Sequence, residues 1–573
     1  MTSRLAVLTL LLAVASRSSV RGQNVPPAGN NLPMRVNDLF QKMDSPSSPG
    51  CALSVMKDGR FLYEHGYGMA DLDHNVAITP TTVFHVASMS KQFTAASILL
   101  LAQEGKLSLD DPVRKYIPEL PDFGTPITIR ELIHHTSGLR DQWDLLGLAG
   151  WRYSLDLITD DDVLAVISRQ KDLNFAPGSK HLYSNTGYTL LAQIVKRVSG
   201  QSLREFTKAR IFGPLAMKST HFRDDHAEIV KQMAYGYEPA EDTFKISLTN
   251  FDTVGATSLL TTVEDLLRWD ENFYHPTVGG RTLIDAMLER GKLNNGEPLD
   301  YASGLVVSTY RGLRTVDHGG ADAGYRSDMI RFPDQHFSVA CLCNLASANP
   351  SELARKVAEI YLGGEMMPEE GPHVEADAVR LTADQLNSRT GTYLNPENDQ
   401  ALRISMRGGK LHIADGPADE GYELRPISAI QFKSASARVD LTFEDSLPGS
   451  PVQFVLKRGD GQPNHFAAVP SFNPSAGQLR EYAGIYSSDE IEPLYDVRLE
   501  KGDLVLHRLR NKPDTLHPVT LDLFAGSIGS IRFTRSSTGK ISGFTLSTGR
   551  IKNMRFVKGR QVVPSNAAVA NSR

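Results

Sequence analysis

The chain reads Phe84-His85-Val86-Ala87-Ser88-Met89-Ser90-Lys91-Gln92-Phe93-Thr94-Ala95 where a loop is predicted to enter a long helix, and the rest of the chain is organised around this stretch. Good helix formers fill residues 92–104 and Gly105 is placed to end the helix. Ser88 and Lys91 are three residues apart, so one helical turn brings the ammonium beside the hydroxyl. A desolvated lysine can lose its proton and activate a serine, and a helix N-terminus can stabilise an oxyanion. We therefore predict Ser88 as a nucleophile and Lys91 as its base.

The same S-x-x-K spacing also occurs at Ser54/Lys57, Ser168/Lys171 and Ser537/Lys540, so spacing alone does not select a serine. Ser54 lies in a strand-like run, Ser168 lies late in a predicted helix, and Ser537 lies in a turn. Of the four serines, only Ser88 is predicted to open a helix.

Length and composition indicate a soluble, multidomain globular protein of 573 residues, 41% hydrophobic and 22% charged. A formal net charge of −5 spread over the chain argues against nucleic acid as a partner. The first 22 residues hold Arg4 and an apolar run from Leu5 to Ala15, which predicts a signal peptide. No later segment is long and apolar enough to span a bilayer. We therefore expect a secreted or periplasmic protein with no membrane span once the signal is removed.

Three cysteines in so long a chain exclude a disulfide scaffold. Cys341 and Cys343 lie two residues apart in a predicted strand and point to the same face, so Cys51 can pair with one of them. We favour the alternative in which all three are buried thiols that act as small apolar residues.

Sequence periodicity predicts a mixture of strands and helices in the region that holds the predicted site residues. A hairpin is predicted at residues 51–56 and 60–67, joined by Lys57-Asp58-Gly59. Further strands are predicted at 304–310, 315–317, 325–332 and 337–344, and helices at 160–170, 188–199, 202–210 and 351–361. Thr261 and Glu264 predict a capping box that opens one more helix.

Two adjacent histidines, His134 and His135, invite a metal interpretation, but no helix-spaced ligand partner follows them. We favour an ordered loop there, and expect neither a metal nor another cofactor.

Tyr183 and Asn185 follow a Pro-Gly turn and lie just before a predicted helix. A tyrosine near a lysine can relay a proton between the serine and the leaving group, and an amide can hold a substrate carbonyl. The alternative is a tyrosine that is merely half buried in a loop.

The predicted strand 315–317 ends at His318-Gly319-Gly320-Ala321. Gly319 and Gly320 would let a substrate lie along the strand edge, and the N–H of Ala321 could donate to an oxyanion. A plain strand end with a Gly-Gly turn is the alternative for this segment.

The last third of the chain contains an internal duplication. Gly391, Tyr393 and Leu411 recur 93 residues later, and Phe443, Phe454 and Phe466 recur 90 residues later. Short strand-like runs between turns predict that each copy is a small antiparallel barrel.

Together, S-x-x-K at Ser88, Y-x-N at Tyr183 and H-x-G at His318 resemble the penicillin-recognising serine hydrolases, which include class C β-lactamases, D,D-peptidases, esterases and D-aminopeptidases. The resemblance covers residues of about 45 to 362. It implies an α+β fold with an antiparallel sheet and helices, a nucleophile at Ser88, a base at Lys91, a proton relay at Tyr183 and a substrate-orienting amide at Asn185.

One departure concerns the third motif, because β-lactamases carry Lys-Thr-Gly where this chain has His318-Gly319-Gly320. The family lysine holds a substrate carboxylate, so the resemblance does not imply efficient penicillin turnover. His-x-Gly is similar to the D-aminopeptidase branch, whose members also carry two C-terminal barrels, and to hydrolases of cyclic peptides with D-residues. We expect His318 to titrate near neutral pH and to lose any grip on a carboxylate as pH rises.

These observations predict a signal peptide at 1–22, a hydrolase domain at 30–365, a linker at 366–385 and barrels at 386–470 and 479–560. The predicted function is an exported serine hydrolase that cleaves amide bonds of short peptides, among them peptides with D-residues, through a Ser88 acyl-enzyme. A carboxylic esterase or weak β-lactamase using the same residues is one alternative, and a non-catalytic penicillin- or peptide-binding module is another. The natural substrate, the oligomeric state and the role of the barrels stay open.

Overall fold

The computed structural model describes residues 31–368, 379, 381–415, 421–434, 439–444, 451–458 and 463–559. The predicted signal peptide and most of the predicted linker lie outside the described residues. No helix in the part that is described is both long and apolar enough to cross a membrane.

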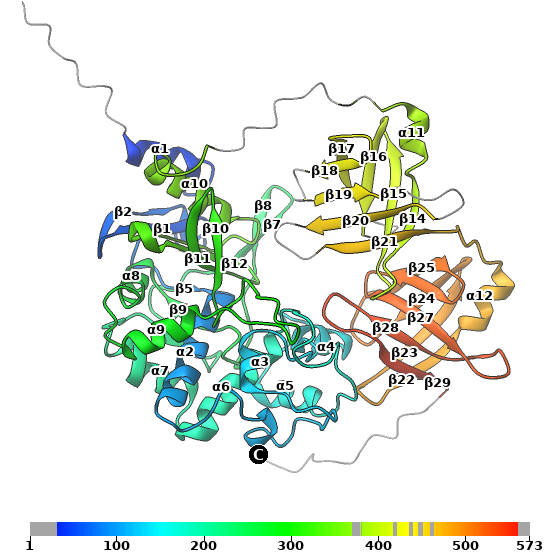
Figure 1. The fold of residues 1–573 in the computed structure, drawn as a ribbon, viewed down its shortest axis with the longest axis horizontal. Coiled ribbons are helices and arrows are strands. Elements are labelled where there is room, and N and C mark those ends of the chain that lie inside the picture. The colour runs from blue at the N-terminus through cyan, green and yellow to red at the C-terminus, as the bar shows by residue number, and fades with distance from the viewer. Residues whose placement is uncertain are drawn as a thin grey trace, which may run out of the picture.

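The catalytic region is built on a six-stranded antiparallel sheet (Figure 1). Its strands in spatial order are β10 (Val306–Tyr310), β11 (Leu313–Asp322), β12 (Tyr325–Phe332), β13 (Phe337–Cys343), β1 (Cys51–Lys57) and β2 (Arg60–Tyr67). Alternate residues of β1 are buried on opposite faces, since Leu53 belongs to one hydrophobic core with Phe40, and Ala52 belongs to another with Phe93. Both faces are therefore covered by helices.

Two helices cover one face, α1 (Leu32–Phe40) and α10 (Pro350–Leu362). On the other face lie α8 (Val263–Glu271) and a helical lobe. The lobe contains α2 (Ser90–Gln103), α3 (Ile129–Ile133), α4 (Gln142–Leu148), α5 (Asp160–Ile167), α6 (Asn185–Ser199), α7 (Leu203–Thr207) and α9 (Gly280–Leu288). Short strands β3 (Met69–Asp71), β4 (Val76–Ala77), β5 (Phe84–His85), β6 (His221–Phe222), β7 (Tyr237–Ala240), β8 (Thr243–Ile246) and β9 (Leu259–Thr261) connect these parts.

Helix α2 runs through the middle of the lobe and is buried from Ser90 to Leu101. A helix surrounded by packed neighbours has no polar face toward water. Lys91, in its first turn, is therefore removed from solvent by the fold itself.

Two local expectations need correction. Strand β11 does not end at His318 but continues to Asp322, because Gly319 and Gly320 keep pairing with β12. A Cβ at Gly320 would lie 2.3 Å from the carbonyl oxygen of Val86, so only glycine fits this approach. Helix α8 is capped by Thr262, whose hydroxyl accepts from the Asp265 N–H at 3.1 Å, while Thr261 stays in β9.

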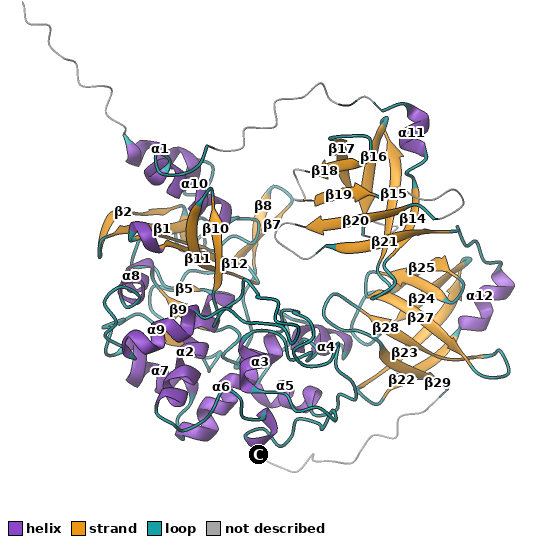
Figure 2. Cartoon of the chain, in the orientation of Figure 1, coloured by secondary structure: helices purple, strands orange, loops and turns teal. Residues whose placement is uncertain are grey.

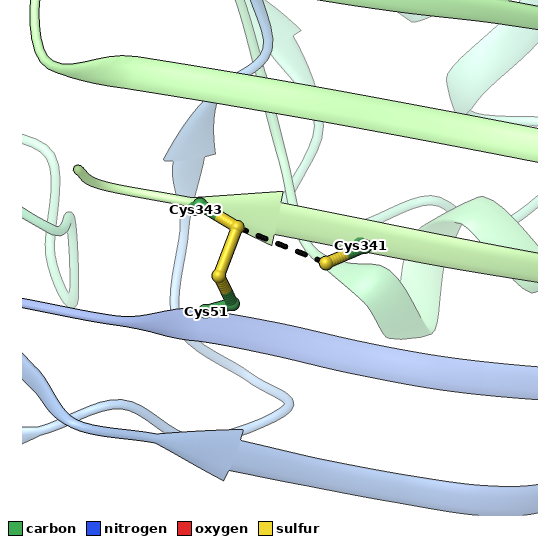
Figure 3. Close-up of side chains that lie close together, drawn as sticks. All are labelled: Cys51, Cys341 and Cys343. Atoms are coloured by element: carbon green, nitrogen blue, oxygen red, sulfur yellow. Dashed lines mark hydrogen bonds between the residues drawn. A yellow bond between two sulfur atoms is a disulfide. The ribbon is translucent and has the colours of Figure 1, made fainter. Parts of the chain in front are cut away.

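The cysteines also differ from the favoured expectation. Cys51 and Cys343 face each other across β1 and β13 and form a disulfide, whereas Cys341 remains a buried thiol. Cys341 and Cys343 lie on the same strand (Figure 3). Their sulfurs are 3.7 Å apart. The open alternative, one bridge from Cys51, is the correct one.

The duplication folds into two closed eight-stranded antiparallel barrels, which are almost wholly strand (Figure 2). Barrel 1 contains β14 (Gly391–Leu394), β15 (Ala401–Arg407), β16 (Lys410–Ala414), β17 (Tyr422–Pro426), β18 (Gln431–Ser434), β19 (Val439–Phe443), β20 (Gln453–Arg458) and β21 (Asn464–Val469), preceded by α11 (Ala383–Asn387). Barrel 2 contains β22 (Gly484–Ser488), β23 (Ile491–Glu500), β24 (Asp503–His507), β25 (Asp514–Thr520), β26 (Leu523–Gly526), β27 (Gly529–Arg535), β28 (Ile541–Ser547) and β29 (Met554–Lys558), preceded by α12 (Ala476–Tyr482).

Equivalent residues of the two barrels make equivalent contacts. Tyr393 and Tyr486 each donate to a carbonyl four residues earlier, at 2.8 and 2.6 Å. Phe454 stacks on Phe466 in barrel 1, and Phe544 stacks on Phe556 in barrel 2. The sequence repeat is therefore a structural repeat.

Barrel 2 docks against the helical lobe beside α4 (Figure 1). Arg140 and Glu490 form an ion pair across this contact, with side chains only 1% and 3% exposed. Tyr495 donates through its hydroxyl to the Leu148 carbonyl at 2.9 Å. The loop between β28 and β29 reaches the start of α4, where Thr548 donates to Asp144 at 2.8 Å.

Candidate active site

All eight residues predicted for the site come together at one cavity of about 520 Å³. The residues that line it include Ser88, Tyr183, Asn185, His318, Gly319, Gly320 and Ala321. Lys91 lies beneath this wall, hydrogen-bonded to Ser88. Neither Ser54, which is buried in β1, nor Ser168, which follows α5, lines the cavity.

Ser88 lies in a short 3₁₀ turn, Ala87–Met89, that leads directly into α2. Its flanking residues are buried, whereas Ser88 is partly exposed to the cavity. Ala87 has a positive φ of 48°, which costs energy for a residue with a side chain and is typical of functional turns. This turn presents the Ser88 hydroxyl at the start of a buried helix.

Lys91 makes three hydrogen bonds through its Nζ. It donates to Ser88 Oγ at 3.0 Å, to Asn185 Oδ1 at 2.9 Å and to the Ala256 carbonyl at 2.7 Å. Burial lowers the pKa of Lys91 to about 7, against the opposing effect of Asp322 and Asp141. Once one proton is lost, Asn185 and Ala256 can hold the two remaining N–H groups while the lone pair faces Ser88.

Tyr183 lies half-buried beside this pair, with its ring centroid 4.9 Å from Lys91 Nζ. Burial raises the pKa of Tyr183, so the phenol is protonated at neutral pH and can donate. The His135 ring packs against the Tyr183 ring, with the two centroids 4.1 Å apart. His135 Nδ1 accepts a hydrogen bond from the Ser184 N–H at 3.1 Å. The His134-His135 loop thus positions the tyrosine by packing.

Asn185 is the first residue of α6, and its orientation comes from Asp141, which the sequence did not single out. Asp141 Oδ2 accepts from the backbone N–H of Asn185 at 2.7 Å and from its Nδ2 at 2.9 Å. The other oxygen, Oδ1, caps α4 by accepting from the Trp143 N–H at 3.0 Å. One buried carboxylate therefore serves two helix N-termini and turns Asn185 Oδ1 toward Lys91.

His318 is buried in β11 and does not behave as expected from its residue type. Its Nδ1 donates to the Gly319 carbonyl at 2.6 Å, which leaves Nε2 to accept from the Tyr301 hydroxyl at 3.0 Å. Burial, with a smaller contribution from the Lys91 charge, lowers the pKa of His318 to about 4. The expectation that His318 titrates near neutral pH is wrong, because desolvation disfavours the imidazolium.

Arg550, from the loop between β28 and β29, is a cavity residue that no local signal could reveal. Its guanidinium carbon lies 5.2 Å from the Tyr183 ring centroid, and its Nη1 lies 3.4 Å from Asp141 Oδ2, a residue 409 positions away in sequence. The barrels therefore do more than pack behind the catalytic region. Barrel 2 supplies part of the cavity wall.

Similarity to known proteins agrees with this geometry. A family model described as Beta-lactamase matches residues 36–362. Penicillin-binding protein 4* of Bacillus subtilis (strain 168) is 30% identical over 433 residues, which covers 72% of this chain and 94% of that protein. A D-aminopeptidase of Brucella melitensis biotype 1 is 27% identical over 529 residues, which covers 89% of this chain and 95% of that protein.

In three dimensions, the octameric penicillin-binding protein homologue from Pyrococcus abyssi shares the fold, with a TM-score of 0.54 at 24% identity, covering 76% of this chain and 100% of that one. The chain belongs to the beta-lactamase family, as the three sequence motifs indicated. It is a serine hydrolase of that family.

Proposed function

We propose that the protein is an exported amidohydrolase that cleaves short peptides, including peptides with D-residues, through an acyl-enzyme on Ser88. The observation that carries this proposal is the contact of Ser88 Oγ with a buried lysine, Lys91, whose pKa of about 7 makes it a base at neutral pH.

Acylation begins when Ser88 Oγ attacks the peptide carbonyl while its proton passes to the neutral amine of Lys91. The tetrahedral oxyanion accepts hydrogen bonds from the backbone N–H groups of Ser88 and Ala321. The phenol of Tyr183 then protonates the leaving amine and regains a proton from Lys91, so the C–N bond breaks and the charges balance. Water repeats the sequence on the acyl-enzyme, releases the acid and restores Ser88.

Two observations support the substrate class and the location. Several relatives named D-aminopeptidase match 89% of this chain and 95% of their own length. The Cys51–Cys343 disulfide fits an oxidising compartment, in agreement with the apolar run at Leu5 to Ala15.

A substrate panel tests the proposal: p-nitroanilides and short peptides of either chirality, a p-nitrophenyl ester, and nitrocefin. The wild-type protein is expected to turn over amides repeatedly, whereas Ser88→Ala is expected to turn over none. Ser168→Ala, which changes another S-x-x-K serine that does not line the cavity, serves as the matched control.

Other outcomes assign the alternatives. Turnover of esters without amides would favour a carboxylic esterase, and turnover of nitrocefin alone would favour a β-lactamase. A single covalent labelling of Ser88 without turnover would favour a binding module.

A further inference from the structure

The carboxylates at the cavity are hydrogen-bonded to protein donors, whereas its arginines keep donors for a ligand. Asp322 accepts hydrogen bonds from Tyr153, Thr257 and His85, and Asp141 is occupied by two helix N-termini. Both carboxylates are thus buried and committed to protein donors. The cationic groups on the wall, Arg550 and Arg326, are consequently the charges that a substrate meets.

Arg550 is held by its backbone, which leaves its side chain available. Its N–H donates to Asp144 Oδ2 at 3.1 Å, and its carbonyl accepts from Asn174 Nδ2 at 2.9 Å. The guanidinium has one hydrogen bond to a described side chain, the long 3.4 Å contact from Nη1 to Asp141. With the side chain 40% exposed, most of its five N–H donors are free to bind a ligand.

The position of Arg550 relative to Tyr183 indicates which part of a substrate it would meet. Tyr183 is the proton donor to the leaving amine in the proposed mechanism, so that nitrogen must approach the Tyr183 hydroxyl. The carboxylate of a leaving amino acid is two bonds from its nitrogen, and Arg550 lies against the same tyrosine ring. His318, neutral above a pKa of about 4, adds no cation at the strand edge. Arg326, the other cation on the wall, already donates through Nη1 to the carbonyls of Ala323 and Tyr325.

We propose that Arg550 binds the C-terminal carboxylate of the residue that leaves, so that barrel 2 selects peptides with a free C-terminus. This inference rests on the proposed function and adds the chemical class of the leaving group. A guanidinium presents parallel N–H donors that match the two oxygens of a carboxylate, which makes the recognition geometric as well as electrostatic.

The test compares an N-acetylated dipeptide of D-residues that has a free C-terminus with the same dipeptide as its C-terminal amide. The ratio of kcat/KM for the acid to that for the amide is measured in wild type, Arg550→Gln, Arg550→Lys and Arg480→Gln. Arg480 is an exposed arginine of α12 in the same barrel and controls for the loss of one positive charge.

Wild type is expected to prefer the free acid, and Arg550→Gln to lower the ratio about ten- to hundredfold, the scale of a hydrogen bond to a charged group. Arg550→Lys should keep part of the preference for the free acid, because lysine retains the positive charge but lacks the parallel N–H donors of the guanidinium. Arg480→Gln should leave the ratio at the wild-type value. The backbone hydrogen bonds of residue 550 remain in each variant, and thermal unfolding checks that the loop stays docked.

Equal turnover of acid and amide by the wild type would overturn the inference and leave the proposed function standing. Equal losses on both substrates in Arg550→Gln would also overturn it, because they would mean that Arg550 acts only through Tyr183 and Lys91. A preference that follows an anion on the acyl side, measured with an N-succinyl amide, would contradict the leaving-group assignment. Absence of Ser88-dependent turnover of any amide or ester would contradict the proposed function itself.

Discussion

Lys91 Nζ lies 3.0 Å from Ser88 Oγ and shares its remaining hydrogens between Asn185 and the Ala256 carbonyl. The lysine is fully buried because α2 is surrounded by packed elements. The same burial that makes α2 a core helix therefore lowers the pKa of its first-turn lysine and makes that lysine a base.

The first prediction is a pH dependence of kcat/KM on an uncharged substrate. Lys91 must be neutral to accept the Ser88 proton, so activity should rise about tenfold per pH unit below about pH 7 and level off above it. The charge of Arg550 lowers the pKa of Lys91, so Arg550→Gln should raise that pKa and move the rise in activity to higher pH. A profile that is flat between pH 5.5 and pH 8.5 would mean that another group accepts the proton.

The second prediction concerns the phenol of Tyr183. Tyr183→Phe should lower kcat/KM roughly a hundredfold, the scale for the loss of a general acid. The matched control is Tyr188→Phe, which removes a buried hydroxyl of α6 that donates to the Ile133 carbonyl at 2.8 Å. That control should keep most of the activity; similar losses in both variants would indicate damage to α6 instead of lost proton transfer.

The third prediction is loss of stability in mild acid. Burial lowers the pKa of His134 to about 4 and of His318 to about 4, and also lowers that of His135. Below an unfolded-state pKa of about 6.5 the unfolded chain binds protons that the folded chain excludes, so stability falls as pH falls from about 6.5 toward 4. Each such histidine contributes a slope of up to about 1.4 kcal/mol per pH unit.

Urea unfolding of wild type and His318→Asn between pH 4.5 and pH 7.5 checks this. The variant should show a shallower slope by about one bound proton, whatever its stability at pH 7.5. Identical slopes would show that His318 titrates alike in the folded and unfolded chains.

The fourth prediction concerns the contact of barrel 2 with the helical lobe. Glu490→Ala leaves Arg140 buried without its partner, and it should reduce the free energy of unfolding by about 3–5 kcal/mol or detach the barrel. Arg555→Ala, which breaks an ion pair with Asp172 whose side chains are 74% and 44% exposed, should cost about 1 kcal/mol or less. Thermal unfolding of the full chain measures both. Equal, small effects would contradict a tightly docked barrel.

The contrast between Ser88 and Arg550 shows what a sequence can reveal. Ser88 and Lys91 are neighbours on one helical turn, so their contact follows from local geometry and was predictable. The barrels were predictable because a duplication leaves a repeat with a nearly constant offset. Arg550 and Asp141 meet only because barrel 2 docks on α4, and no local pattern encodes that contact.

Burial explains the remaining differences. The residue type of His318 suggested a titration near neutral pH, but its environment is set by strands and helices distant in sequence. The pairing of Cys51 was likewise open, because only the register of β1 against β13 decides which cysteine it faces. Such properties depend on the whole fold and become visible only in three dimensions.

Trapping the acyl-enzyme and locating it tests the nucleophilic role of Ser88 most directly. The wild-type protein is mixed with a slowly deacylating ester or penicillin, quenched in acid, digested and examined by mass spectrometry. We expect one adduct, on the peptide that contains Ser88, which is absent in Ser88→Ala and forms roughly a hundredfold more slowly in Lys91→Ala. An adduct on any other residue, or one that forms at the wild-type rate without Lys91, would contradict this expectation.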